Sequence, residues 1–143
     1  MVDGIVSSPY RRAIDTIAPF VAASAREIAL DERLREREGT FLAAIADHIA
    51  AAEACFTDHS LCLEGSETGF ETQERAWAAI EGMLQSSYAL PVLVSHGQLL
   101  SSTLARIDGT TGLGRWRSMT TPDVFLLESV EPSTCRVQQV WPG

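Results

Sequence analysis

Two arginines stand where a short apolar strand is predicted to turn into a helix. The strand covers residues 4–7, Ser8 suits the N-cap of the helix, and Pro9 suits its first position. Arg11 and Arg12 then fall in the first turn, where backbone N–H groups attract anions and a guanidinium matches phosphate oxygens. Because cations at this end oppose the helix dipole, the pattern indicates an anion site. A plain helix cap with two solvated arginines is the alternative.

A histidine follows a continuous apolar run in the second half of the chain. The run, residues 91–95, is typical of a strand that is buried on both faces of a parallel sheet. In open α/β sheets, ligands bind beyond the carboxyl ends of the strands, which is where His96 would lie. Gly97 would let the backbone turn sharply or approach a ligand closely. The pattern predicts a functional histidine, and a histidine that is merely hydrogen-bonded at a strand end is the alternative.

A third group of candidate residues is the charged segment 34–39, in which Glu36 lies between two arginines. A carboxylate in such a place could donate a proton beside a phosphate, although a solvated charged turn is the alternative. The other two histidines are His48, expected on a helix surface, and His59, expected in a loop. Neither has metal-ligand spacing with a carboxylate or a thiol, so no metal is predicted.

The elements that must position these residues alternate between strands and helices. We expect helices over residues 9–24 (bent or divided at Pro19), 40–54, 69–87 and 99–107, the third opened by a capping box of Thr68 and Glu71. Strands are expected over residues 4–7, 91–95, 123–127 and 135–140, the last two joined by a turn at residues 131–133. Residues 28–34 are expected to form a short strand and an exit loop. This order predicts one domain over residues 1–143, an α/β fold built as a three-layer α/β/α sandwich with a mainly parallel sheet.

Composition and charge restrict the classes of partner. The net charge of −8 argues against nucleic acid and against an anionic membrane surface, although a small anion could still bind at a local site. No apolar stretch is long enough to cross a membrane. The odd count of three cysteines, without metal-ligand spacing, favours reduced thiols and a cytoplasmic location.

Three motifs, taken together and in this order, resemble the histidine phosphatase superfamily and its phosphoglycerate mutase-like branch. They are Ser-Ser-Pro-x-x-Arg-Ala at residues 7–13, Leu-x-Glu at 34–36 and Ser-His-Gly at 95–97. A Gly-Ser-Glu-Thr sequence at residues 65–68, before Arg75, is similar to the Gly-Glu-Ser helix start of the family. The resemblance extends over essentially the whole chain and implies a phosphoglycerate mutase-like fold.

The resemblance also implies roles for individual residues. Arg12 would be the phosphate-binding arginine, and His96 would be the second histidine of the site, which binds the phosphoryl group without becoming phosphorylated. Glu36 matches the carboxylate that acts as acid and base. The resemblance implies a phosphate-binding set formed by Ser8, Arg12, His96, Gly97 and Gln98. It implies neither a cofactor nor a metal, because cationic side chains take that place.

One motif of the family has no counterpart, because Arg-His-Gly occurs nowhere in these 143 residues. In the family this motif ends the first strand and carries the nucleophilic histidine. We therefore expect a chain that is truncated at its N-terminus, without the first strand and helix. The sheet would then be open beside the strand that leads to His96, leaving backbone groups unpaired. We expect association of copies through the opened sheet, or altered strand pairing; a nucleophile at His48 or His59 is a further alternative.

The resemblance favours a phosphatase over a mutase. The mutase sequence around the carboxylate is Glu-Arg-His-Tyr-Gly, whereas Glu36 is followed here by Arg-Glu-Gly. The implied reaction is hydrolysis of a small phosphate monoester through a phosphohistidine in the complete protein, with the present chain inactive. The expected partner is a small phosphorylated substrate or inorganic phosphate. The alternatives are a non-catalytic phosphate-binding or assembly module, and a phosphoglycerate mutase proper.

Overall fold

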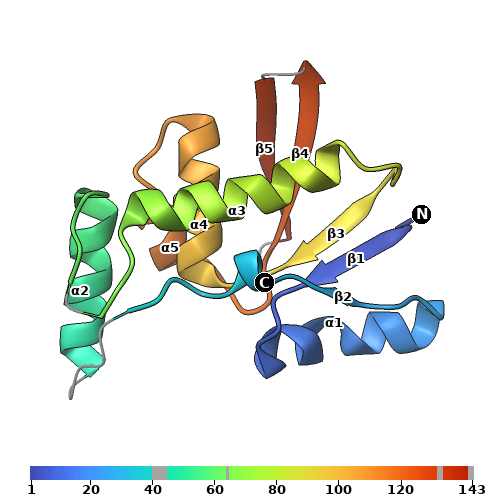
Figure 1. Cartoon of the computed structure of the whole chain (residues 1–143), viewed down its shortest axis with the longest axis horizontal. Helices are drawn as coiled ribbons and strands as arrows, with labels where there is room; N and C mark the ends of the chain where they lie inside the picture. Colours follow the sequence, from blue (N-terminus) through green and yellow to red (C-terminus); the bar gives the residue numbers. More distant parts are fainter. Residues whose placement is uncertain (40–44, 64, 132–133, 142–143) are drawn as a thin grey trace.

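The computed structural model describes residues 1–39, 45–63, 65–131 and 134–141, and its elements follow the predicted alternation (Figure 1). In chain order they are β1 (Gly4–Ser7), α1 (Arg11–Ser24), β2 (Ala29–Leu30), the 3-10 helix η1 (Glu32–Leu34), α2 (Ile45–Thr57), α3 (Gly69–Leu84), β3 (Pro91–Val94), α4 (Gly97–Asp108), α5 (Leu113–Ser118), β4 (Val124–Glu131) and β5 (Thr134–Trp141). The short helix α5 was not predicted. Across the described ranges, no helix has the length and apolar character needed to span a bilayer.

Three strands form a parallel sheet in the order β2-β1-β3. Ser7 at the end of β1 is in register with Leu30 of β2 and with Val94 of β3. The backbone N–H of Ser8 donates to the carbonyl of Val94 at 2.9 Å, one residue beyond the ladder. The carboxyl ends of β1 and β3 therefore meet at one edge of the sheet, which is where α/β proteins bind ligands.

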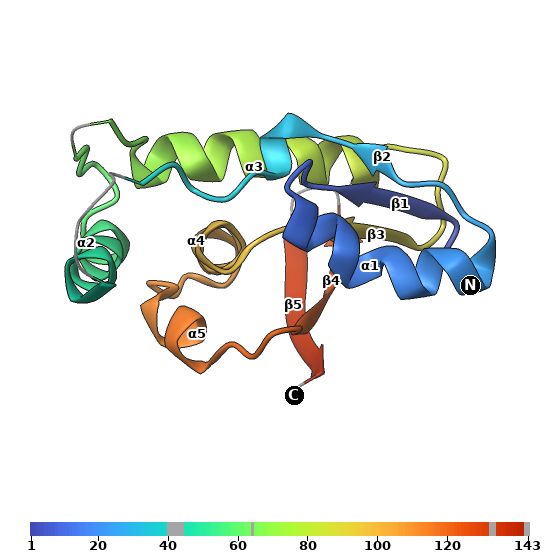
Figure 2. The same cartoon turned by 90° about the horizontal axis from the view of Figure 1, so that it is seen from below.

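Helices cover both faces of this sheet, as the predicted three-layer arrangement requires. Figure 2 shows α1 on one side of the three strands and α3 on the other, with α4 beside α3. The buried side chains between these layers are mostly aliphatic and small: Ile5, Ala13, Leu34, Ala76, Ala79, Ile80, Leu99, Leu104 and Ala105. Full burial of one leucine side chain stabilises the fold by about 1.5–3 kcal/mol. This core fixes the ends of β1, β3 and α4 relative to one another.

The two closing strands form a separate antiparallel sheet. β4 pairs with β5, with Leu127 opposite Val137, and neither strand joins the parallel sheet. Among the residues that the structure describes, β3 has a strand neighbour on one edge only, and so has β4. Within the described ranges, no other strand occupies the free edge of β3. β3 is half-buried along its length, not buried on both faces as predicted.

The start of α1 differs from the prediction. The helix begins at Arg11, two residues after Pro9, and its N-cap residue, Tyr10, makes no side-chain cap. Ser8 lies two residues before the N-cap, where its hydroxyl accepts from the backbone N–H of Tyr10 at 3.3 Å and also contacts a side chain of the site described below. Pro19 lies inside α1 and does not divide it.

The predicted capping box at the start of α3 is confirmed. The hydroxyl of Thr68 accepts from the N–H of Glu71 at 3.1 Å, and the carboxylate of Glu71 accepts from the N–H of Thr68 at 2.8 Å. α3 ends at Leu84, three residues before the predicted end. The hydroxyl of Ser86 donates to the carbonyl of Met83 at 2.6 Å, a local bond that competes with helix continuation. Leu84 is 41% exposed, so its predicted inward position is wrong.

Other element boundaries shift by a few residues. Residues 28–34, predicted as a short strand and an exit loop, form the two-residue strand β2 and then η1, where Asp31 accepts from the N–H of Arg33 at 2.8 Å. α2 ends at Thr57 rather than at residue 54, while its predicted start at residues 40–44 lies outside the described residues. The predicted turn at 131–133 falls largely on residues 132–133, which also lie outside them.

Candidate functional site

The imidazole of His96 lies at the edge where β1 and β3 end. His96 is the N-cap residue of α4, and its extended backbone places the side chain next to the start of α1. It is 7% exposed. Its Nδ1 accepts a hydrogen bond from Nε of Arg12 at 3.1 Å, and its Nε2 lies 2.8 Å from the hydroxyl of Ser8. Because an arginine Nε can only donate, the ring proton belongs on Nε2, which donates to Ser8.

The environment of His96 keeps the ring neutral. Burial, followed by the positive charges of Arg12 and Arg75, lowers the pKa of His96 from 6.5 to about 4. A neutral imidazole with its proton on Nε2 is a hydrogen-bond donor at neutral pH. An anion bound beside it would oppose the two arginine charges and raise this pKa.

The two arginines at the start of α1 have different surroundings. Arg11 is exposed and pairs with Asp15 one turn along the helix, at 2.8 Å. Arg12 instead donates its Nε to His96 and lies over the ring of Tyr10, with 4.9 Å from its guanidinium carbon to the ring centroid. Its side chain is exposed, and its two terminal nitrogens make no hydrogen bond to the described part of the chain. Arg12 can therefore present two parallel N–H donors to an anion.

Tyr10 is a neighbour of the site that sequence reasoning missed. Its ring meets the His96 ring edge to face, with centroids 5.2 Å apart, and it also supports the Arg12 guanidinium. Tyr10 occupies a variable position of the motif at residues 7–13, so no residue-type signal pointed to it.

The carboxylate of Glu36 lies at the N-terminus of α4. It accepts from the backbone N–H of Leu99 at 3.0 Å, of Gln98 at 3.3 Å and of Arg37 at 2.9 Å. A carboxylate at this position is favourable because the amide groups and the helix dipole are both positive there. The structure thus brings Glu36 close to the residues that follow His96. The N–H of Gln98, which was predicted to bind phosphate, donates to the Glu36 carboxylate instead.

Gly97 is the first residue of α4, beside Trp116 of α5. A Cβ atom at Gly97 would lie 3.5 Å from the Trp116 ring, which is an ordinary contact distance. Gly97 does not have a positive φ, and the packing around it would accept a Cβ atom, so neither its backbone nor its protein neighbours demand a glycine.

The remaining histidines lie elsewhere. His59 packs against Gly69 and the ring of Phe70, with ring centroids 5.9 Å apart. His48 is exposed on α2, which lies at the left of both views, away from the start of α1 (Figures 1 and 2). Over the described ranges, no cluster of three or more His, Cys, Asp or Glu side chains could hold a metal ion.

Comparison with solved structures gives the same fold for the chain. The mycobacterial glucosyl-3-phosphoglycerate phosphatase Rv2419c, solved with inorganic phosphate, is 23% identical with a TM-score of 0.78, covering 100% of this chain and 78% of that one. A mycobacterial hydrolase is 22% identical with a TM-score of 0.79, covering 99% and 76% of the two chains. YhfR of Bacillus stearothermophilus is 25% identical with a TM-score of 0.73, covering 97% and 73%.

Sequence comparison identifies the family. No curated protein matches the sequence significantly. The model of the histidine phosphatase superfamily (branch 1) matches residues 1–138, which is nearly the whole chain. The fold of the three solved structures agrees with this match. The chain therefore belongs to the histidine phosphatase superfamily.

Proposed function

We propose that this chain binds the phosphate group of a small phosphate monoester, or inorganic phosphate, between Arg12 and His96. The observation that carries the proposal is the hydrogen-bonded series from Arg12 Nε through the His96 ring to the Ser8 hydroxyl. It lies at the carboxyl ends of two parallel strands, with the terminal nitrogens of Arg12 open to a ligand. The phosphate bound to the mycobacterial phosphatase of the same fold supports this class of ligand.

Binding would use donors that are already oriented. The terminal N–H groups of Arg12 would contact two phosphate oxygens in parallel, while its Nε keeps the bond to His96. The Nε2–H of His96 would turn from the Ser8 hydroxyl to a third oxygen, and Ser8 could then donate its own proton to the ligand. These donors would also stabilise the negative charge of a phosphoryl group in transfer.

Hydrolysis by the mechanism of the family requires a nucleophilic histidine at the site in addition to His96. None of the described residues supplies it there. Of the three histidines, all within the described ranges, only His96 lies at the ends of β1 and β3. In the complete reaction, a histidine would attack the phosphoryl group, and Glu36 would protonate the leaving oxygen and then activate water. We propose that the 143-residue chain alone binds phosphate without transferring it. The same observation favours, as second candidate, a non-catalytic phosphate-binding or assembly module.

The open strand edges support a proposal about assembly. β3 and β4 each have one edge without a strand neighbour in the described residues, and Val124, Val140 and Trp141 of the β4–β5 hairpin are about half exposed. An unpaired edge flanked by apolar side chains favours association. We propose that residues 1–143 fold as one domain and that copies associate through this opened sheet.

Phosphate titration tests the proposed function. Inorganic phosphate is added to the purified chain while the imidazole resonances of His96 are followed by NMR. We expect a saturable shift of His96 that is lost in Arg12→Gln and retained in Arg11→Gln, because Arg11 is engaged with Asp15. Equal loss in both variants, or no shift of His96 in the parent chain, contradicts the proposal. Turnover of p-nitrophenyl phosphate that His96→Ala abolishes would contradict the absence of transfer.

A further inference from the structure

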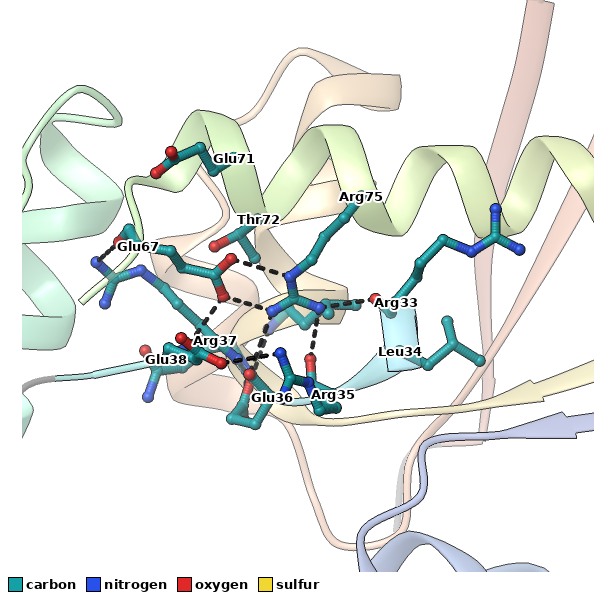
Figure 3. A network of polar contacts seen from close by, with 12 residues as sticks. Arg33, Leu34, Arg35, Glu36, Arg37, Glu38, Glu67, Glu71, Thr72 and Arg75 are labelled. Atoms are coloured by element: carbon teal, nitrogen blue, oxygen red, sulfur yellow. Dashed lines mark hydrogen bonds and ion pairs between the residues drawn. The ribbon is translucent and has the colours of Figure 1, made fainter. Parts of the chain in front are cut away.

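Arg75 of α3 points towards the segment that carries Glu36, and every N–H of its guanidinium has an acceptor (Figure 3). Nε donates to Oε2 of Glu67 at 2.9 Å, and Nη1 donates to the carbonyls of Arg33 at 2.7 Å and Arg35 at 2.8 Å. Nη2 donates to the carbonyl of Glu36 at 3.2 Å and to Oε1 of Glu67. A guanidinium has five N–H donors in a fixed planar fork, so this site uses all of them. The Arg75 side chain is only 19% exposed.

The carbonyls that Arg75 binds belong to a stretch with no helical partners of its own. Residues 33–36 include the end of the short helix η1 and the chain after it, so their carbonyls need hydrogen-bond donors from elsewhere. Arg75 binds the first, third and fourth of these carbonyls. The second, that of Leu34, accepts from the hydroxyl of Ser95 at 2.7 Å. Four successive carbonyls are thus held, three from α3 and one from the residue that precedes His96.

Glu67 supplies the counter-charge that orients Arg75. Burial by itself would raise the pKa of Glu67, but hydrogen bonds from Arg75 and from the N–H of Glu38 outweigh it and hold the pKa below its ordinary value. The Glu38 bond to the Glu67 carboxylate measures 2.9 Å, and Arg37 donates to the Glu67 carbonyl at 2.6 Å. Both ends of the segment 33–38 are therefore fixed to the same buried ion pair.

We propose that Arg75 is a positioning residue, which holds the backbone of residues 33–36 so that the Glu36 carboxylate stays at the N-terminus of α4, beside His96. The consequence for catalysis rests on the acid–base role proposed for Glu36. A lysine at this position could not reproduce the arrangement, because it has three donors on one nitrogen in place of a planar fork of five. Arg75 therefore fixes the place of a functional carboxylate that it reaches only through the main chain.

The test is the hydrogen exchange of the Leu99 amide, which donates to Glu36, measured relative to the Ala105 amide in the same helix. In Arg75→Lys we expect the Leu99 amide to exchange about tenfold faster or more, relative to Ala105. The matched control is Arg106→Lys, since Arg106 bridges α4 to Glu74 of α3 without touching residues 33–38. An unchanged Leu99 to Ala105 ratio in Arg75→Lys, or the same change in Arg106→Lys, overturns the proposal.

A second background separates positioning from a general loss of structure. In Glu36→Ala the Leu99 amide has lost its acceptor, so Arg75→Lys should add no further change to the ratio; an added change overturns the proposal. If Arg75→Lys does not fold, Glu67→Gln takes its place and is expected to make the Leu99 amide exchange faster relative to Ala105.

A phosphate titration of the parent chain is independent of these exchange measurements. Its failure contradicts the proposed function, whereas the Leu99 result decides the role of Arg75.

Discussion

Lowering the pH from 6.5 to 4 should lower the free energy of unfolding, because His96 takes up a proton more readily in the unfolded chain than in the folded chain. In the folded chain, burial and the charges of Arg12 and Arg75 lower the pKa of His96 to about 4, whereas the unfolded chain has the ordinary 6.5. In this window the unfolded state binds more protons, so stability rises with pH and is lost as pH falls towards 4. One pKa unit corresponds to about 1.36 kcal/mol, so the contribution is at most about 3 kcal/mol.

The assay is urea unfolding of the parent chain and of His96→Gln at several pH values from 7 to 4. Carboxylates with lowered pKa values, such as Asp31 and Glu67, also make stability fall towards acid pH, but they are common to both proteins. The free energy of unfolding of the parent minus that of the variant should therefore fall with decreasing pH, by at most about 3 kcal/mol. A difference that does not depend on pH would refute the burial and charge environment assigned to His96. Saturating phosphate should make this difference depend less on pH, because an anion beside the ring raises the pKa of folded His96 towards its unfolded value.

Two further predictions concern the fold and the assembly. Thr68→Ala removes the hydroxyl of the capping box and should lower the free energy of unfolding, measured by urea titration, by about 1 kcal/mol. The control is Thr16→Ala, which should lower it much less, because the Thr16 hydroxyl only donates back to the carbonyl of Arg12. Equal losses in the two variants would contradict the capping role. Light scattering after size exclusion should show a dimer or a larger species, and a monomer at all concentrations would contradict association through the opened sheet.

The parts of the fold that the sequence predicted correctly depend on short-range signals. The capping box of Thr68 and Glu71, the strand at residues 91–94 and the position of His96 at its end all follow from neighbouring residues. The boundaries that shifted depend on contacts that a local pattern does not contain. Leu84 fits the helical period of α3, yet it is 41% exposed.

The parts of the site that the sequence did not reveal depend on long-range contacts. Ser8 looked like a helix cap, whereas its hydroxyl meets a histidine 88 positions away. The bonds from Glu36 to the start of α4 link residues 62 and 63 positions apart, and Arg75 binds main-chain atoms about 40 positions away. Backbone acceptors have no residue type, so no motif could have indicated the role of Arg75. Motif order predicted that Ser8, Arg12 and His96 lie together, but it indicated neither Tyr10 nor the atoms through which these residues interact.

The most direct test of the central claim is a crystal structure of the chain grown with inorganic phosphate. The account predicts a phosphate with oxygens within hydrogen-bond distance of the terminal nitrogens of Arg12 and of Nε2 of His96, with the bond from His96 to Ser8 broken or lengthened. A phosphate-saturated crystal in which no anion lies between these two side chains, and in which the Ser8 contact is unchanged, would contradict it.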